Sequence, residues 1–335
     1  MPRVYLFFWN RIRLMELVSS FSVLLMRFDA ISLVPHKDPP PPLGSDVLLQ
    51  MLFSPVNPAD LLEIDGSYAN SRLPLTPGAE GVGQVVACGP EVKSLAVGDL
   101  VVPLPRGNWQ TYRTLDESAL IPLPKGVNLT EAAMLRVNPA TAHLLLADRS
   151  PGDWVAYNAP NSSVGRLLAA LGKSAKLNMV AVARDPQAAA ALAQVGVAAC
   201  TTGPTLPDEL RQLSAGQGVD LALDCVAGPD SAWLTRSLRV GGTLRVYGHL
   251  SGKDCAIPSR QLTFGKVQVH GFNLGQALSQ LSFNAVRKLY GELAEQLVQR
   301  KLPMPDCTIY PLTSIEAALS AARTSNKSKV LIALS

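Results

Sequence analysis

A short segment near the middle of the chain places one glycine and several hydrogen-bonding side chains between a predicted strand and a predicted helix. The apolar run Trp154-Val155-Ala156-Tyr157 predicts a buried strand, and residues 166–171 predict a helix. The segment between them reads Asn158-Ala159-Pro160-Asn161-Ser162-Ser163-Val164-Gly165. Of the dinucleotide-binding pattern GxGxxG only Gly165 is present, the glycine that lets helix and strand pack closely. The succession of strand, turn and helix favours a dinucleotide site over an ordinary capped helix.

The chemistry that this segment offers is the binding of a pyrophosphate. A helix N-terminus presents backbone N–H groups and the positive end of a dipole to an anion. Asn161, Ser162 and Ser163 add side-chain donors beside it. We therefore predict that the phosphates of a dinucleotide lie against the turn that ends at Gly165.

A basic and an acidic residue follow the next predicted strand, Asn178 to Ala183. An acidic residue here would accept the 2′-hydroxyl of NAD, whereas an arginine accommodates the 2′-phosphate of NADP. Pro186 fits the first position of the following helix, which makes Asp185 its N-cap. Because Asp185 then has a structural role, Arg184 is left to pair with the phosphate, and NADPH is the predicted cofactor. The alternative for Arg184 is an ordinary exposed arginine.

The sequence lacks the ligands of a catalytic zinc site. Such a site needs thiolate, imidazole and carboxylate groups that converge on one metal. The segment 57–60 contains no cysteine, and no histidine stands beside Glu80. We therefore predict no metal, and without that Lewis acid the oxidation of an alcohol is disfavoured. The reduction of an activated C=C bond needs none, because hydride can add to the β-carbon while a protein acid or water protonates the α-carbon.

The composition is that of a folded chain with a mildly basic surface. Of 335 residues, 47% are apolar and 17% are charged, and the net charge is +4. The length predicts two domains. No cluster of Lys and Arg with interleaved aromatic residues is present, so nucleic acid is not a predicted partner. Five widely spaced cysteines predict reduced thiols and a cytoplasmic location, not a disulfide framework.

The N-terminus allows more than one interpretation. Three arginines among the first 13 residues precede an apolar stretch, Leu17 to Met26, that is too short to span a bilayer. Residues 27–29 do not form a small-residue cleavage site, so neither a secretory signal nor insertion into a membrane is predicted. Two alternatives remain open: a transit peptide that would direct the chain to the mitochondrial matrix, and a true start at Met15.

Two different patterns of predicted secondary structure along the chain predict two kinds of domain. From residue 21 to 123, short β-like runs alternate with Pro and Gly. After Pro124, helical and strand patterns alternate, beginning with a helix from Thr130 to Ala147 that has Thr130 as its expected N-cap. This alternation predicts an α/β fold with a doubly wound parallel sheet. The tail from Ile309 reads strand, helix, strand and is expected to return to the first domain.

Four segments resemble the zinc-free medium-chain dehydrogenases/reductases. Glu63 to Tyr68 and Pro77 to Val86 are similar to the glycine-rich signature of the family's catalytic domain. Arg136 to Ala142 and Asn158 to Gly165 resemble the mitochondrial-type trans-2-enoyl thioester reductases, which also carry Arg-Asp after the second Rossmann strand. The similarity runs from about residue 30 to the end of the chain.

The resemblance implies a fold, an activity and partners. A Rossmann domain, residues 124–274, is inserted into a GroES-like, β-rich catalytic domain of residues 21–123 and 275–335, and residues 1–20 are an extra segment. Members of the family reduce 2-enoyl-CoA or 2-enoyl-ACP with NADPH and act as dimers. The resemblance therefore implies an acyl thioester of coenzyme A or of acyl carrier protein as substrate, and a homodimer.

The same resemblance assigns roles to individual residues. Tyr68 matches the tyrosine regarded as catalytic, and its phenol, with an ordinary pKa of about 10, would donate a proton at neutral pH. It would polarise the thioester carbonyl or protonate the enolate as hydride arrives. The implied cofactor contacts are Asn138, Asn161, Ser162, Ser163, Val164, Gly165, Arg184, Tyr247, Gly248, His249, Leu250, Phe272, Asn273, Leu274 and Lys329.

Three positions depart from the family's pattern. Pro186 stands where the family has a second arginine, Asn273 where it commonly has tryptophan, and Ser163 where it has glycine. Because Asn273 would lie beside the nicotinamide and the acyl pocket, an NADPH:quinone reductase of the same superfamily stays open as an alternative. A non-catalytic dinucleotide-binding protein is the alternative from a different functional class.

Overall fold

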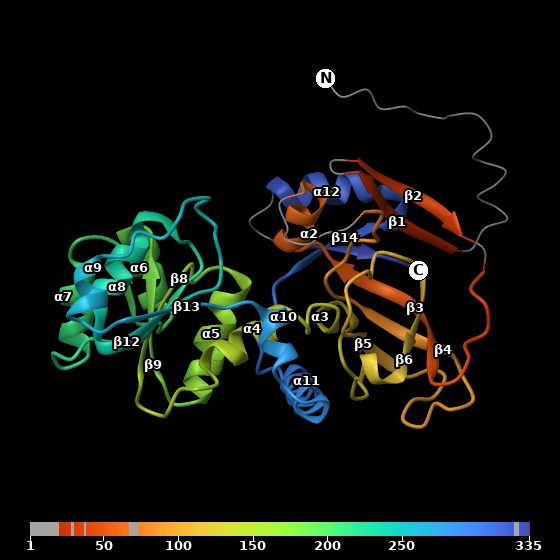
Figure 1. Cartoon of the computed structure of the whole chain (residues 1–335), viewed down its shortest axis with the longest axis horizontal. Coiled ribbons are helices and arrows are strands. Elements are labelled where there is room, and N and C mark those ends of the chain that lie inside the picture. Colours follow the sequence, from red (N-terminus) through yellow and green to blue (C-terminus); the bar gives the residue numbers. More distant parts are fainter. Residues whose placement is uncertain (1–19, 28–29, 37, 67–72, 325–327) are drawn as a thin grey trace, which may run out of the picture. The chain divides into compact units, whose positions relative to one another are not determined.

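The computed structural model describes residues 20–27, 30–36, 38–66, 73–324 and 328–335. The chain forms two compact units. Unit 1 comprises the chain up to Arg136 with Tyr290–Val298 and Pro305–Ser335, and unit 2 comprises Val137–Leu289 and Gln299–Met304. Figure 1 labels many of the elements of both units. The domain limits predicted at 124 and 274 stay predictions, because compact units and inserted domains need not coincide.

The sheet of unit 2 is parallel throughout and has the strand order β10-β9-β8-β11-β12-β13. Its strands are β8 (Trp154–Asn158), β9 (Asn178–Ala183), β10 (Ala199–Thr201), β11 (Val219–Asp224), β12 (Leu238–Val246) and β13 (Gln268–Gly271). This order is the doubly wound arrangement predicted from the sequence. It reverses between β8 and β11, and ligands of such sheets bind beyond the carboxyl ends of the strands at that point.

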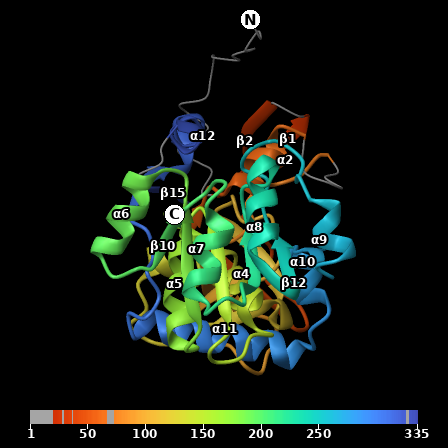
Figure 2. The same ribbon diagram turned by 90° about the vertical axis from the view of Figure 1, so that its left-hand side faces the viewer.

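Helices connect these strands and cover a core of aliphatic side chains, and Figure 2 shows several of them. The helices of unit 2 are α4 (Asn138–Leu146), α5 (Ser163–Ser174), α6 (Pro186–Gln194), α7 (Leu206–Leu213), α8 (Ser231–Ser237), α9 (Ser259–Thr263) and α10 (Leu274–Ser279), with a 3-10 turn η2 (Gly228–Asp230). The buried core joins the strand residues Ala156, Val180 and Ala222 to Leu210 of α7 and Leu234 of α8. None of the helices in the described ranges has the length and hydropathy that crossing a bilayer demands.

The sheet of unit 1 is largely antiparallel, with the order β14-β15-β3-β4-β5-β7 and β6 paired to β3. Its strands are β3 (Asp46–Pro55), β4 (Val82–Cys88), β5 (Leu100–Pro103), β6 (Tyr112–Asp116), β7 (Leu120–Pro122), β14 (Cys307–Pro311) and β15 (Lys329–Ala333). A separate hairpin consists of β1 (Ser20–Arg27) and β2 (Ala30–His36). Leu331 of β15 pairs with Pro55 of β3, so the C-terminal tail returns to the first β-rich region as predicted.

Few helices accompany this sheet. They are α2 (Pro58–Ile64), α3 (Leu129–Ala132) and α12 (Ile315–Thr324), with the 3-10 turns η1 (Glu117–Ala119) and η3 (Leu312–Ser314), while α11 (Phe283–Val298) has residues in both units. The apolar core contains fully buried side chains of β3 such as Val47, Leu49 and Met51, together with Trp109 and Ile332. This β-rich unit with one parallel α/β unit confirms the predicted fold class.

One predicted helix is wrong. The pattern from Thr130 to Ala147 predicts a single helix, but α3 ends at Ala132 and α4 begins at Asn138. Pro139 explains the break, because a proline inside a helix lacks the N–H and its ring collides with the carbonyl four residues earlier. In the structure Pro139 lies in the first turn of α4, where its missing N–H has no consequence.

The predicted N-cap of this region is wrong as well. Asn128, not Thr130, caps α3, since Asn128 Oδ1 accepts hydrogen bonds from the backbone N–H groups of Thr130 (3.0 Å) and Glu131 (3.2 Å). Asparagine and threonine are both good N-cap residues, so residue type alone does not choose between positions two residues apart.

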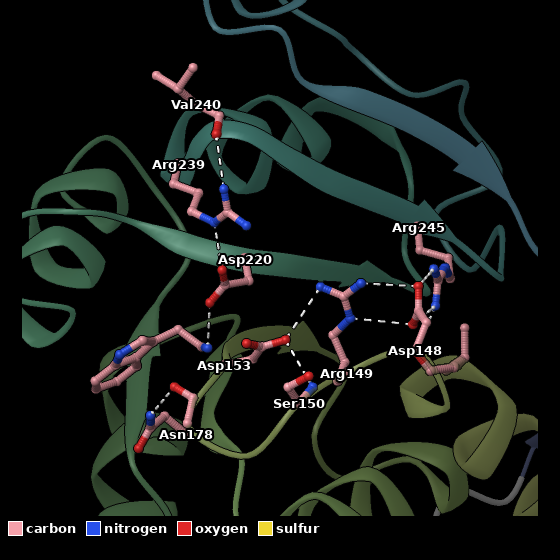
Figure 3. Close-up of polar contacts among 12 residues, drawn as sticks. Asp148, Arg149, Ser150, Asp153, Asn178, Asp220, Arg239, Val240 and Arg245 are labelled. Carbon is pink, nitrogen blue, oxygen red and sulfur yellow. Dashed lines mark hydrogen bonds and ion pairs between the residues drawn. The ribbon is translucent and has the colours of Figure 1, made fainter.

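Ion pairs tie strand β12 of unit 2 to the end of helix α4 (Figure 3). Arg245 donates to the carbonyl oxygen of Leu145 at 2.8 Å and pairs with Asp148, which also pairs with Arg149. Burial opposes ionisation of Asp148, but its hydrogen bonds from Arg245 and Arg149 outweigh burial and hold its pKa well below the usual range. The network holds β12 against the end of α4.

Candidate functional site

The turn between β8 and α5 lies at the carboxyl end of the sheet, where the strand order reverses. Ser162 caps α5 there: its Oγ accepts a 3.0 Å hydrogen bond from the N–H of Gly165 and donates its proton to the carbonyl of Ala159 at 2.8 Å. A serine hydroxyl has one proton to give. Ser162 therefore holds the turn in shape, and in this conformation its hydroxyl is not the additional phosphate donor that the sequence suggests.

Gly165 allows helix and turn to approach closely. A Cβ at this position would lie 2.8 Å from Cα of Pro160 and would also meet the carbonyl oxygen of Ala159. The packing role predicted for Gly165 is thereby confirmed. The backbone N–H groups of Ser163 and Val164, in the first turn of α5, have no acceptor within the helix. These amides and Asn161 are what the turn presents to an anion, and their contact with a cofactor stays a prediction.

The residues after β9 divide their roles as expected from helix geometry. Asp185 Oδ1 accepts a 2.8 Å hydrogen bond from the N–H of Ala188, so Asp185 is the N-cap of α6, as predicted. Arg184 is exposed, and its guanidinium makes no hydrogen bond or ion pair to any residue in the described ranges. A carboxylate held by the helix leaves the cation available for an anionic ligand at this edge of the sheet.

The loop after β12 packs against the loop after β11. The N–H of Leu250 donates to the carbonyl of Cys225 at 3.2 Å, and a Cβ at Gly248 would lie 2.9 Å from Sγ of Cys225. Gly248 therefore serves this close contact, while His249 is exposed. The loop residues predicted as cofactor contacts thus lie beside the point where the strand order reverses.

Tyr247 in this loop carries a buried phenol. Within the described part of the chain, its Oη has no hydrogen-bond partner of ordinary geometry. Burial, reinforced by the neighbouring Cys225, raises the pKa of Tyr247 well above its usual value, so the phenol stays protonated at neutral pH. Buried polar groups are normally satisfied, and the polar group that faces this phenol is the thiol of Cys225. A contact of Tyr247 with the cofactor stays a prediction.

The segment after β13 gives Asn273 a structural role. Asn273 Oδ1 accepts a 3.0 Å hydrogen bond from the N–H of Gln276 and so caps α10, whose first residue is Leu274. The N–H of Phe272 bonds the carbonyl of Val246 at 2.8 Å, which continues the pairing of β13 with β12. The tryptophan common at this position in the family cannot cap a helix. The departure at Asn273 therefore has a local structural explanation.

Two further predicted contacts lie in different units. Asn138 is the first residue of α4 in unit 2. Lys329 begins β15 in unit 1, and its Nζ donates a 2.7 Å hydrogen bond to Oδ1 of Asn57. Burial lowers the pKa of Lys329, whereas the carboxylates of Glu80 and Asp60 oppose that change. Lys329 thus belongs to a polar cluster inside unit 1.

This cluster, which we call the α2 cluster, consists of Asn57, Asp60, Glu80, Arg106 and Lys329. Asp60 Oδ1 accepts hydrogen bonds from the N–H of Ala79 (2.8 Å) and from Nη2 of Arg106 (3.1 Å). Asn57 Nδ2 donates to Oε1 of Glu80 at 3.0 Å. Burial raises the pKa of Asp60 to about 6, although Arg106 lowers it.

Sequence reasoning missed Arg106 and gave no role to Asp60. Arg106 also binds Glu63 Oε2 at 2.7 Å, so two turns of α2 are anchored by one guanidinium. The only sequence signal was the spacing of Asp60 and Glu63, which places both carboxylates on one face of a helix.

Tyr68 lies outside the described residues, four positions after the end of α2 at Ile64. The described ranges contain no group of three or more His, Cys, Asp and Glu side chains that could hold a metal ion. The prediction that the protein carries no zinc awaits metal analysis. The cysteines Cys88, Cys200, Cys225, Cys255 and Cys307 are free thiols.

Comparisons with known proteins place these features in a family. The alcohol dehydrogenase GroES-like domain matches residues 44–125, and the zinc-binding dehydrogenase family matches residues 163–292. The mitochondrial enoyl-[acyl-carrier-protein] reductase of Mus musculus is 35% identical over 83% of this chain and 78% of its own length. The human enzyme of the same name is 34% identical over the same shares of both chains.

Solved structures share the whole fold. A Bacillus thuringiensis protein assigned as an NADPH:quinone reductase superimposes with a TM-score of 0.85 at 28% identity, over 94% of this chain and 98% of its own. The mitochondrial 2-enoyl thioester reductase heterodimer of Candida tropicalis superimposes with a TM-score of 0.82 at 23% identity, over 94% and 99%. The parallel sheet, the GroES-like unit and these relatives together show that the chain is an oxidoreductase of the medium-chain dehydrogenase/reductase superfamily and belongs to the family of the mitochondrial enoyl-[acyl-carrier-protein] reductases.

Proposed function

We propose that the protein reduces the C2=C3 double bond of 2-enoyl thioesters, carried on coenzyme A or acyl carrier protein, with NADPH. The names of the relatives in mouse and human support the reaction, since both are enoyl-[acyl-carrier-protein] reductases. The observation in this chain that carries the choice of cofactor is the division of roles after β9. Asp185 caps α6, while Arg184 is exposed and would pair with the 2′-phosphate.

The residues of unit 2 fit a dinucleotide. The first-turn amides of α5, with Asn161 and Ser163 beside them, would bind the pyrophosphate, and Ser162 keeps that turn in shape. Gly165 lets α5 pack closely against this turn, because a Cβ there would meet the backbone of Ala159 and Pro160. The loops 247–250 and 272–274, with Asn138, would line the nicotinamide half. The cofactor, when bound, supplies a hydride to the β-carbon of the substrate.

The protein would stabilise the negative charge of the enolate and supply the proton for the α-carbon. As hydride forms the new C–H bond at the β-carbon, the C=C electrons move toward the α-carbon and the thioester carbonyl. The phenol of Tyr68 would stabilise that enolate and give its proton to the α-carbon, and water would reprotonate the phenolate. A phenol suits this step, because at its ordinary pKa it is protonated at neutral pH.

A second candidate reaction is the reduction of quinones with NADPH. It is supported by the similarity to the Bacillus thuringiensis protein, which is assigned to that activity and aligns along almost its entire length. The small polar side chain of Asn273 in place of the family's tryptophan also suits a different substrate pocket. The two candidates share a cofactor and differ in the acceptor, so an assay of acceptors separates them.

We also propose that the protein forms a homodimer and that it is located in the mitochondrial matrix. The Candida tropicalis relative is a heterodimer of reductase subunits, which supports assembly of this chain with a second copy. The mouse and human relatives are named as mitochondrial, and this favours the matrix over the cytoplasm that the thiols predict. The arginine-containing segment on which a transit peptide would depend lies outside the described residues.

The experiment is NADPH oxidation by the purified full chain with crotonyl-CoA, with a benzoquinone, and with no acceptor. Turnover with crotonyl-CoA exceeding that with the quinone by at least about tenfold in kcat/KM is the expected result. The reverse ratio would establish the quinone reductase. Binding of NADPH without turnover of either acceptor would establish a dinucleotide-binding protein without this chemistry.

A further inference from the structure

Two buried polar side chains meet where the strand order of the unit 2 sheet reverses. Asn158 ends β8 and Asp224 ends the adjacent strand β11, and they are 5% and 0% exposed. Asn158 Nδ2 donates a 2.6 Å hydrogen bond to Oδ1 of Asp224. A buried carboxylate needs several donors to be tolerated. The groups that donate hydrogen bonds to Asp224 identify the segment of the chain that it holds in place.

Two of the donors to Asp224 are backbone amides of the loop that follows β11. Oδ1 of Asp224 accepts the backbone N–H of Val226 at 3.0 Å and that of Ala227 at 2.8 Å. The N–H of Cys225 donates to Oδ1 of Asn158 at 2.7 Å. Three successive amides of the loop 225–227 are therefore held by two side chains.

The loop needs this restraint because one of its residues is strained. Ala227 has φ 61° and ψ −160°, a conformation that residues other than glycine rarely adopt. Such a conformation persists only when the surrounding contacts over-determine it. The hydrogen bond from Ala227 to Asp224 is one of these contacts. Removal of the carboxylate should therefore let the loop relax to an ordinary conformation.

Relaxation would reach the next loop along the sheet edge. The N–H of Ser251 donates to the carbonyl of Val226 at 2.9 Å, and that of Leu250 to the carbonyl of Cys225 at 3.2 Å. The N–H of Tyr247 donates to the carbonyl of Asp224 itself at 2.9 Å. The loop 247–251 thus takes its position from the loop 225–227.

We propose that Asp224 and Asn158 are positioning residues that shape the nicotinamide half of the cofactor site. This inference rests on the proposed function. A dinucleotide crosses the sheet edge where the order reverses, with its 2′-phosphate end at the second strand, β9, and its pyrophosphate at α5. The other half then lies on the side of β11 and β12, over the two loops that Asp224 controls. Neither side chain needs to touch the cofactor.

The test compares two ligands that share the adenosine half. Asp224→Asn preserves size but removes the charge that organises the amides, and dissociation constants are measured by calorimetry for NADPH and for 2′,5′-ADP. We expect NADPH to bind about tenfold or more weaker and 2′,5′-ADP to change less than about twofold, since a charged acceptor is lost only on the nicotinamide side. Ser231→Ala is the matched control. It removes the hydrogen bond of 2.5 Å from the Ser231 hydroxyl to Oδ2, away from the loop, and should affect NADPH less.

A second substitution that restores NADPH affinity distinguishes a positioning role of Asp224 from a purely structural one. Ala227→Gly in the Asp224→Asn background removes the strain and should restore part of the NADPH affinity, because glycine adopts this conformation freely. Equal weakening of both ligands, or no weakening of either, would overturn the positioning role. Should Asp224→Asn not fold, hydrogen exchange of the wild type decides: NADPH should protect the amides of 224–228 and 247–251, and 2′,5′-ADP should not.

The outcomes also separate this inference from the proposed function. Wild-type protein that binds NADPH but reduces no enoyl thioester overturns the reaction, while the comparison of ligands still supports or overturns the positioning role. A wild type that binds 2′,5′-ADP and NADPH with equal affinity, with no protection of either loop, overturns the positioning role even when the reductase activity is present.

Discussion

The ammonium of Lys329 lies 2.7 Å from the side-chain carbonyl oxygen of Asn57, so one end of β15 is bound to the residue that precedes α2. The family resemblance assigns Lys329 to the cofactor, but within unit 1 it is the cation next to Glu80 and Asp60. Buried carboxylates are tolerated when cations and N–H groups face them. Lys329 therefore stabilises the α2 cluster whether or not it also contacts NADPH.

Lys329→Met should destabilise the protein. Methionine retains the apolar stem but leaves Asn57 without its donor and the carboxylates without one cation. We expect the free energy of unfolding, measured with urea, to fall by about 1–3 kcal/mol, the usual range for leaving a buried polar group unsatisfied. Lys301→Met, at an exposed position, is the control and should change it little. Unchanged stability of Lys329→Met would leave cofactor binding as the sole role of this residue.

The raised pKa of Asp60 predicts how stability depends on pH. Its folded pKa of about 6 lies above the ordinary value of 3.8, so the folded state binds the proton more tightly than the unfolded state. Protonation of Asp60 therefore contributes to the free energy of unfolding. This contribution is present in full below about pH 4 and is lost as pH rises through about 6, with a slope of at most about 1.4 kcal/mol per pH unit.

A comparison of the wild type with Asp60→Asn isolates the contribution of Asp60 to the pH dependence of stability. The free energy of unfolding is determined for the wild type and for Asp60→Asn between pH 4 and pH 7, and the difference, wild type minus variant, is plotted. We expect that difference to become smaller as pH rises through this window. Asp116, an exposed carboxyl whose pKa is lowered by hydrogen bonds from Ser118 and Ser45, is the control. Its variant Asp116→Asn should give the opposite slope at lower pH. A difference that grows with pH for Asp60 contradicts the prediction.

Arg184→Ala should weaken NADPH much more than NADH. The lost charged hydrogen bond to the 2′-phosphate corresponds to about 1.5–3 kcal/mol, whereas NADH has no phosphate there. Dissociation constants for both cofactors are compared by fluorescence titration. Arg260→Ala, an exposed arginine on α9, is the control and should change neither. Equal losses for NADPH and NADH would show that Arg184 is structural and that the cofactor is chosen elsewhere.

Local rules predicted what depends on neighbours in the sequence. The doubly wound sheet, the cap at Asp185 and the close packing at Gly165 follow from periodicity, helix-capping preferences and the absence of a side chain, and the structure confirms all three. Pro139 also indicates the break between α3 and α4, but the prediction of one continuous helix followed the apolar pattern from Thr130 onward instead. A proline in a helical pattern should have had the greater weight.

Contacts between distant segments were not predictable. Arg106 reaches Asp60 and Glu63 only because the fold brings α2 beside the loop after β5. Asn158 and Asp224 meet only because β8 and β11 become neighbours in the sheet. Both clusters consist of residue types that are ordinary on a surface, so composition and spacing give no sign that they are buried. Such networks become visible only with the three-dimensional structure.

Tyr68→Phe tests the proposed proton donor. The variant keeps the aromatic ring and its packing but removes the hydroxyl, so folding and the dissociation constant of NADPH should change little. If the phenol acts in the transition state, kcat for crotonyl-CoA should fall by roughly 10²-fold or more, the usual scale for the loss of a general acid. KM should remain close to the wild-type value, because an interaction made only in the transition state leaves substrate binding unaffected. Tyr310→Phe, at a half-buried position in β14, is the matched control and should retain full activity. Near wild-type turnover by Tyr68→Phe would exclude the tyrosine as donor and leave water, or another side chain, to protonate the α-carbon. A rise in KM with kcat unchanged would assign Tyr68 to substrate binding, and the enolate would then need a different source of stabilisation.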